Sequence, residues 1–239
     1  MTYVMSDLHG CYAEYLRALE TIDLQEDDTL YILGDILDRG PEPVRLLQDI
    51  MARSNVILLV GNHEYMAMRV LSRLCVEITE ANAGQGLSAE DITAIANWSM
   101  NGGDITLRQF READRSDLWD MLDYLNDCPI AEEVKVRGRR YVLVHAGLDN
   151  FSARRPLEDY DLFEVAFHSP DFSRTYYRTK YLVTGHTPTA AVDPAMSGQI
   201  IEKRRHIALD CGCVFGLGLG VYCLDTREKW VIPSENYMK

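Results

Sequence analysis

Five short apolar runs, each followed at once by glycine and polar residues, restrict how this chain of 239 residues can fold. Continuous apolar runs of about four or five residues with turn residues behind them are typical of strands buried on both faces. The runs occupy residues 2–5, 30–33, 56–60, 141–144 and 181–184. They predict an α/β protein whose strands lie in a well-buried core.

Helical spacing fills the gaps between the first three runs. Apolar residues form one stripe in residues 15–22, and a second stripe in residues 43–50 begins with Pro43 in its first turn. Strand, helix, strand, helix and strand in succession is the doubly wound α/β pattern. Towards the end of the chain, the pattern predicts a hairpin through residues 137–139 and strands within residues 206–210, 220–226 and 229–233.

Residues 65–130 predict a helical insertion over the sheet. Helices are expected at residues 66–78, at 88–100 with Ser88 as the N-cap, and at 119–125. No stretch rich in proline, glycine or serine bounds the insertion, so we expect residues 1–239 to form a single domain.

The composition argues against several classes of protein. A formal net charge of −13 disfavours binding to nucleic acids or to anionic membranes. No apolar run approaches the roughly 18 residues that span a bilayer, and the N-terminus lacks the pattern of a signal peptide, so a cytoplasmic protein is expected. The six cysteines form no C-x-x-C pair and are expected to be reduced, although Cys211 and Cys213 lie close enough for a metal or oxidation site.

Polar side chains gather directly behind the five runs, where the carboxyl ends of strands bind ligands in α/β sheets. Four of the six histidines lie there, together with carboxylates and an amide. Each cluster alone could serve a turn or a helix cap, but their recurrence at five strand ends favours one site. Oxygen and nitrogen donors without thiolate suit Mn, Fe, Zn or Co. Two such ions about 3.5 to 4 Å apart need a bridging carboxylate, and Asp35 is the natural bridge.

These clusters carry a family resemblance. The segments SDLHG, GDILDRG and GNHE, followed by two later histidines, resemble the GDxHG, GDxxDRG and GNHE signature of the phosphoprotein phosphatases, with Ser6 in place of the first glycine. The segments HGCY, WSMNGG with Thr106 after it, and LVTGHTPT resemble the bacterial and phage serine/threonine phosphatases in particular. The resemblance implies a calcineurin-like metallophosphoesterase fold, a central β-sandwich flanked by helices. The insertion would then form a cap beside the metal cleft and select substrates.

The resemblance also implies a pair of divalent metal ions, with Mn²⁺ as the expected metal and Fe, Zn or Co as alternatives. One ion would be held by Asp7 and His9, and Asp35 would be shared between both ions. The second ion would be held by Asn62, His145 and His186.

The remaining polar residues of the motifs receive roles in binding and proton transfer. His63 would be the general acid that protonates the leaving alkoxide, with Asp38 orienting its ring. Arg39 and Asn62 would bind phosphate oxygens, since a guanidinium matches the geometry of a phosphate. Glu64 receives no catalytic role, because a carboxylate at a helix N-terminus is adequately explained by the helix dipole.

One departure from the family concerns a second phosphate-binding arginine, which is expected between the last two histidine motifs. His168 and Ser169 stand where it would be sought first. The sequence leaves four candidates open: Arg154, Arg155, Arg174 and Arg178.

Three functions are compatible with these residues. The favoured hypothesis is a serine/threonine protein phosphatase that hydrolyses phosphomonoesters of a phosphorylated protein or peptide through a hydroxide bridging the two metals. The alternative is a symmetrical diadenosine tetraphosphate hydrolase, which would need stacking aromatics such as those at Tyr176, Tyr177 or Tyr181, unless these are core residues. A non-catalytic module that binds phosphoproteins is least favoured, because it would be expected to have lost the proton donor or the bridging ligand.

Overall fold

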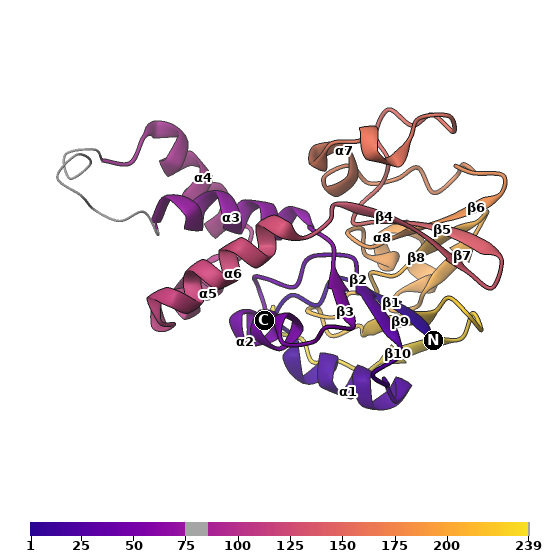
Figure 1. The fold of residues 1–239 in the computed structure, drawn as a ribbon, viewed down its shortest axis with the longest axis horizontal. Coiled ribbons are helices and arrows are strands. Elements are labelled where there is room, and N and C mark those ends of the chain that lie inside the picture. The colour runs from indigo at the N-terminus through magenta and orange to yellow at the C-terminus, as the bar shows by residue number, and fades with distance from the viewer. Residues whose placement is uncertain (75–85, 239) are drawn as a thin grey trace.

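The computed structural model describes residues 1–74 and 86–238, which fold into two five-stranded mixed sheets packed face to face (Figure 1). The first sheet has the order β10-β9-β1-β2-β3, and its strands are β1 (Thr2–Met5), β2 (Thr29–Ile32), β3 (Val56–Leu58), β9 (Leu219–Cys223) and β10 (Lys229–Ile232). The second has the order β4-β5-β6-β8-β7, and its strands are β4 (Ala131–Val136), β5 (Arg139–Val144), β6 (Lys180–Thr184), β7 (Ile201–Lys203) and β8 (His206–Ala208). Strands β1, β2 and β3 run parallel, as do β5, β6 and β8.

Helices flank the sheets on their outer sides. Helices α1 (Tyr12–Ile22) and α2 (Pro43–Met51) pack on the first sheet. The helical insertion, comprising α3 (Asn62–Leu74), α4 (Ala89–Met100), α5 (Asp104–Glu112) and α6 (Arg115–Asp127), extends to one side of both sheets (Figure 1). On the side of the second sheet lies α7 (Leu162–Ala166), and α8 (Thr189–Val192) follows β6; two short 3-10 helices span Leu157–Asp159 and Pro194–Met196.

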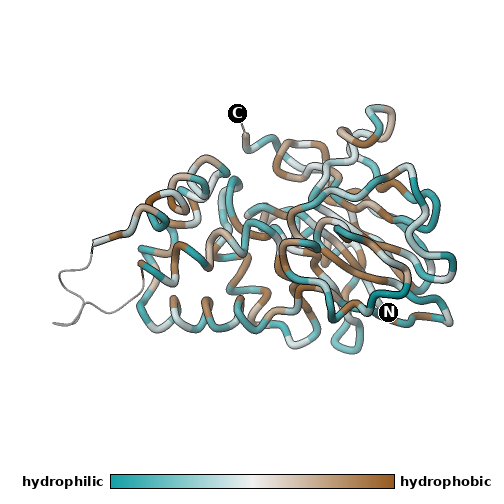
Figure 2. The backbone as a smooth tube through the Cα atoms, turned by 90° about the horizontal axis from the view of Figure 1, so that it is seen from above, coloured by the Kyte–Doolittle hydropathy of each residue, from teal (hydrophilic) through white to brown (hydrophobic). Residues whose placement is uncertain are grey.

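The period of two along each strand divides the core into layers. In β1, Tyr3 and Met5 join the hydrophobic cluster beneath α1 and α2, whereas Val4 points into the cluster between the sheets. Across that interface, Val4 shares its cluster with Leu143 and Val183 of the second sheet. Apolar residues accordingly follow the strands through the interior of the molecule (Figure 2). Both faces of the central strands are therefore buried, which explains their continuous apolar sequences.

Most expected elements are present. The five apolar runs form β1, β2, β3, β5 and β6, and Ser88 caps α4 in a capping box with Asp91. The sandwich is confirmed, whereas the doubly wound succession extends only from β1 to β3, because the chain enters a second sheet after the insertion. The helix expected at 66–78 is described as far as Leu74, and residues 75–78 lie outside the described part. Helices α5 and α7 were not expected.

Two further expectations concern the cysteines and membrane-spanning helices. The five cysteines in the described part of the chain, which excludes Cys75, form no disulfide. Among the described helices, none has both the length and the apolar character required to cross a membrane.

Candidate metal centre

The five polar loops meet at one edge of the sandwich, because the parallel strands of both sheets end there. Backbone hydrogen bonds tie the loops to one another: His9 N donates to Asp35 O at 2.8 Å, and Gly185 N donates to His145 O at 2.8 Å. The second bond joins the loops after β5 and β6, and the first joins those after β1 and β2. The structure thus brings the predicted site residues of both sheets together.

These side chains are carried by residues with an unusual backbone conformation. Six site residues adopt the left-handed region with φ between 45° and 70°: Asp7, His9, Asp35, Asp38, Arg39 and His186. Such conformations are uncommon for residues other than glycine and gather at functional sites. Glycine is required at position 185, because a Cβ there would lie 1.9 Å from Ser6 Oγ and 2.1 Å from Asp7 Oδ2.

Asp35 lies at the middle of the donor atoms. Its Oδ2 is 3.4 Å from His145 Nε2 and 3.7 Å from His9 Nε2. Two groups of potential ligands therefore share Asp35, one with His9 and His63, the other with His145 and His186, and within each group the donor atoms lie within 4.8 Å of one another. This is the arrangement that a carboxylate bridging two ions requires.

The imidazoles are oriented by backbone carbonyls. His9 Nδ1 lies 2.9 Å from Leu37 O, and His145 Nδ1 lies 2.6 Å from Leu33 O. A backbone carbonyl that accepts from Nδ1 is the usual second contact of a ligating histidine, and it turns each Nε2 towards the other donors, where its lone pair can bind a metal. The donor set therefore fits a divalent ion of the first transition series.

Asn62 and His186 complete the second group. Asn62 Oδ1 lies 2.9 Å from His145 Nε2 and 3.0 Å from His186 Nδ1. The carboxylate of Asp7 accepts the backbone N–H of His186 at 2.9 Å and the hydroxyl of Ser6. Asp7 joins neither group of potential ligands, so its pairing with His9 on one ion stays a prediction.

His63 and Asp38 form a buried dyad beside the donors. His63 Nδ1 lies 2.6 Å from Asp38 Oδ2, which leaves Nε2 facing the site. Two residues of the insertion hold the carboxylate: Trp98 Nε1 donates to Asp38 Oδ2 at 2.8 Å, and Thr106 Oγ1 donates to Asp38 Oδ1 at 2.6 Å. The WSMNGG segment was the sequence signal for this contact, although it gave no role to either residue.

Arg39 lies over the site between the dyad and the donors. Its Nη1 is 2.9 Å from His9 Nε2, and its Nη2 is 2.9 Å from His63 Nε2. A cation in this position matches the expected contact with phosphate oxygens. Among the candidates for a second arginine, Arg155 is paired with Glu164 and Arg174 lies over the rings of Phe151 and Tyr176, so the structure directs neither to the donors.

Glu64 does more than the sequence analysis allowed. Its fully buried carboxylate accepts four backbone N–H groups, those of Asp35 at 2.7 Å, Ile36 at 2.9 Å, Leu37 at 3.1 Å and Gly61 at 2.9 Å. The interpretation of Glu64 as a helix N-terminal carboxylate alone was therefore incomplete. This side chain fixes the loop that carries the shared Asp35.

Burial and close charges set the protonation of the donors. Burial acts to raise the pKa of Asp35, but the imidazoles of His145 and His63 outweigh it and hold that pKa well below its usual value. Burial acts to lower the pKa of His145, and Asp35 reverses this and raises it to about 10. Burial and the neighbouring His145 lower the pKa of His186 to about 4. At neutral pH the metal-free site thus holds a charged Asp35–His145 pair beside a neutral His186.

Two donor groups that share one buried carboxylate at the ends of parallel strands define a class of metal-dependent hydrolases. The chain belongs to the calcineurin-like phosphoesterase family, whose model matches residues 2–190.

Two similar relatives are both named symmetrical bis(5'-nucleosyl)-tetraphosphatase. The protein from Erwinia tasmaniensis is 32% identical over 99 residues, which cover 41% of this chain and 36% of that protein. The protein from Wigglesworthia glossinidia brevipalpis is 29% identical over 98 residues, which cover 40% of this chain and 36% of the relative. Each match spans about a third of the relative's length.

Solved structures share the fold over nearly the whole chain. A candidate diadenosine tetraphosphatase has a TM-score of 0.65 at 17% identity and covers 98% of this chain and 94% of its own. A serine/threonine phosphatase from Saccharomyces cerevisiae has a TM-score of 0.55 at 14% identity, covering 98% of this chain and 80% of its own. At these identities the likeness establishes the fold and no more.

Proposed function

We propose that this chain is a dinuclear metal-dependent hydrolase that cleaves dinucleoside tetraphosphates symmetrically. The observation that carries the chemistry is the position of Asp35, whose Oδ2 lies 3.4 Å from His145 Nε2 and 3.7 Å from His9 Nε2. The substrate is suggested by the two relatives named for that reaction. This reverses the order expected from sequence, which put a protein phosphatase first.

Six residues would hold the two ions. We assign Asp7, His9 and the shared Asp35 to one ion, and Asn62, His145 and His186 with Asp35 to the other, with Mn²⁺ as the proposed metal. When held by these residues, divalent ions would supply Lewis acidity to the phosphoryl oxygens and would lower the pKa of a bound water.

The side chains around the ions bind and protonate the substrate. Arg39 offers a planar fork of N–H donors to phosphate oxygens, and its guanidinium already lies 2.9 Å from His63 Nε2. In the proposed reaction His63 would donate a proton from Nε2 to the leaving oxygen after Arg39, which contacts Nε2 in this structure, moves onto the phosphate. Asp38 accepts from Nδ1 and keeps the ring turned. A nucleoside diphosphate is a less basic leaving group than a serine alkoxide, so this proton matters less for the dinucleotide than for a phosphomonoester.

A serine/threonine phosphatase acting on phosphorylated proteins is the second candidate. It is favoured by the contact of Trp98 and Thr106 with Asp38, since these residues belong to the segment that resembles the bacterial phosphatases. A non-catalytic phosphoprotein-binding module is disfavoured, because His63, Asp38 and Asp35 all stand within reach of one another.

The two enzymatic candidates are separated by a direct comparison of substrates. The metal-stripped protein, reconstituted with Mn²⁺, is given diadenosine tetraphosphate or a phosphothreonine peptide, with Asp35→Asn as the blank. We expect higher kcat/KM on the dinucleotide and ADP as its only nucleotide product. Higher kcat/KM on the peptide would reject the proposal in favour of the protein phosphatase, and an unsymmetrical split into ATP and AMP would reject symmetrical cleavage.

A further inference from the structure

Three aromatic side chains from two distant segments meet beside the metal donors. The ring of Tyr65 in α3 lies 5.1 Å from that of Phe163 and 5.7 Å from that of Phe167, both edge to face. Phe163 and Phe167 stack on each other at 5.1 Å with an interplanar angle of 27°. We call these three rings the aromatic platform.

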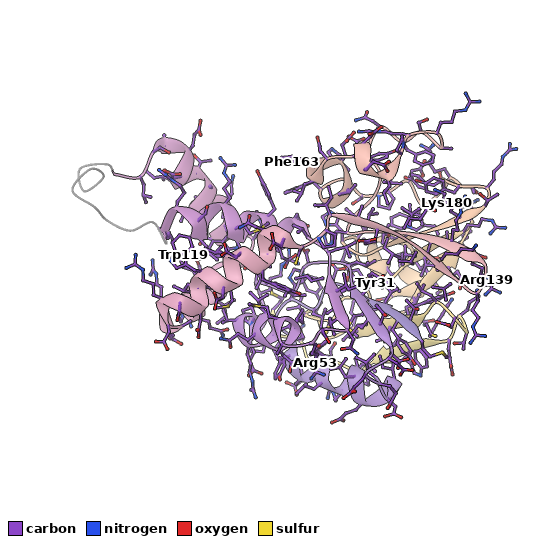
Figure 3. The ribbon with its side chains drawn as sticks, in the orientation of Figure 1. Tyr31, Arg53, Trp119, Arg139, Phe163 and Lys180 are labelled. Atoms are coloured by element: carbon purple, nitrogen blue, oxygen red, sulfur yellow. The ribbon has the colours of Figure 1, made fainter. Side chains whose placement is uncertain are left out.

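The platform is open to solvent where most large apolar side chains are buried. Phe163 is 49% exposed although it contacts both other rings. It lies on the side of α7 that faces the helical insertion (Figure 3). By contrast, Tyr176 and Tyr177 are buried in the core of the second sheet, and Tyr181 stacks on Tyr141, so the tyrosines first considered for stacking serve the fold.

Both halves of the platform are fixed to metal donors. Tyr65 follows Asn62 by three residues in α3, and side chains three apart lie on the same helical face with Cβ atoms about 5 to 6 Å apart. On the other side, Ala146, the residue after His145, donates its N–H to Val165 O of α7 at 2.7 Å. The backbone therefore ties the segments that carry the rings to those that carry Asn62 and His145.

Hydrogen bonds also fix the N-terminal end of α7. Asp161 and Glu164 form a capping box at its start, and Glu164 accepts hydrogen bonds from Arg155 at 2.6 and 2.7 Å. A five-residue helix would not be stable alone, so these contacts hold an exposed aromatic surface in place.

We infer that the aromatic platform binds one nucleobase of the dinucleotide. This inference rests on the proposed function and names the part of the substrate that the metal donors do not recognise. Bases stack on aromatic rings regardless of sequence because every base has a π face, and such stacking is lost on substitution by alanine. A nucleoside joined through its phosphates to the reacting phosphorus is tethered near the metal donors, which is where the platform lies.

The test compares ligands with and without a base on variants of Phe163. For Phe163→Ala we expect the KM for diadenosine tetraphosphate and the inhibition constant of ADP to rise at least about fivefold, the lower end for loss of one stacked base. The inhibition constant of pyrophosphate, which has no base, should change less than about twofold. Phe163→Trp should retain the affinity for ADP and Phe163→Leu should lose it. Trp119→Ala, which removes another exposed aromatic on α6 at a distance from Phe163, is the matched control (Figure 3).

Each result separates the inference from the proposed function. If the wild type cleaves the dinucleotide but Phe163→Ala and Phe163→Leu bind ADP like the wild type, the platform is rejected and the function stands. Equal weakening of ADP and pyrophosphate would also reject base stacking, since it would mean a general distortion of the site. If the wild type does not cleave the dinucleotide, both the proposed function and the inference are overturned.

Discussion

At the scale of single residues, the proposed mechanism makes the dyad of His63 and Asp38 responsible for protonating the leaving group. His63→Asn removes the proton on Nε2 but keeps a polar side chain of similar size. We expect turnover of a substrate with a basic leaving group, such as an alkyl phosphate, to fall about 10²- to 10⁴-fold. Turnover of p-nitrophenyl phosphate should fall much less, because p-nitrophenolate needs no proton to leave.

The measurement is kcat on both substrates for wild type and variant, with bound metal quantified in each. Because His63 also lies within reach of Asp35, an unchanged metal content is needed to attribute the loss to proton transfer. Equal losses on both substrates at full metal content would remove His63 from the acid role.

His206 is a second residue whose protonation has a measurable consequence, here for stability. It is 5% exposed, its Nε2 lies 2.9 Å from Thr184 Oγ1, its Nδ1 has no hydrogen-bond partner among the residues that the structure describes, and burial lowers its pKa to about 4. Between pH 6.5 and about 4 the unfolded chain binds a proton at this site that the folded chain does not, so stability falls as the pH falls.

We therefore expect the free energy of unfolding of wild type to drop between pH 7 and pH 5 by about 2 kcal/mol more than that of His206→Gln. Glutamine keeps a partner for Thr184 and does not titrate. Urea unfolding of both proteins at the two pH values measures the difference, and parallel pH profiles would contradict the account.

At the scale of elements, the helical insertion supports the site partly through the hydroxyl of Thr106. Thr106 at the start of α5 is fully buried; its Oγ1 donates to Asp38 Oδ1 at 2.6 Å and accepts from Asp38 N at 2.9 Å. Thr106→Val preserves the shape but leaves both groups of Asp38 without this partner, which costs about 1 to 3 kcal/mol of stability.

Because Asp38 orients His63, Thr106→Val should also lower kcat about tenfold on basic leaving groups, with little change in KM. Thr106→Ser restores the hydroxyl and should restore kcat. Steady-state kinetics and thermal unfolding of the three proteins test this. A loss of stability without a change of kcat would show that the insertion supports the fold only.

The elements differ in how far sequence could predict them. Strands such as β1 and β6 were predictable because burial on both faces gives an unbroken apolar run. Their division between two sheets was not, since a buried strand has the same pattern in one sheet or in a sandwich. Helix α7 is too short for a periodic signal.

At the site, contacts between residues far apart in the sequence were the features that sequence could not predict. The donors at strand ends were predicted from sequence, and the structure brings Asp35, His9 and His145 together. The four hydrogen bonds of Glu64 and the pairing of Tyr65 with Phe163 depend on loops meeting in space, which no local pattern records.

At the scale of the whole molecule, the proposed function requires the chain to bind an anionic substrate against a net charge of −13. Among the described contacts, the cation facing the donors is Arg39, so most of the attraction has to come from bound divalent ions. The two-sheet architecture makes this possible by bringing donors from both sheets to one edge.

The most direct test of this account is the metal content of Asp35→Asn measured beside its hydrolytic activity. After reconstitution with Mn²⁺ and removal of free metal, we predict two ions per wild-type chain, and fewer than one per variant chain together with loss of hydrolysis. Asp120→Asn, an exposed carboxylate on α6, should match the wild type. Two tightly bound ions and undiminished hydrolysis in Asp35→Asn would contradict the claim that this carboxylate is shared by both metal sites.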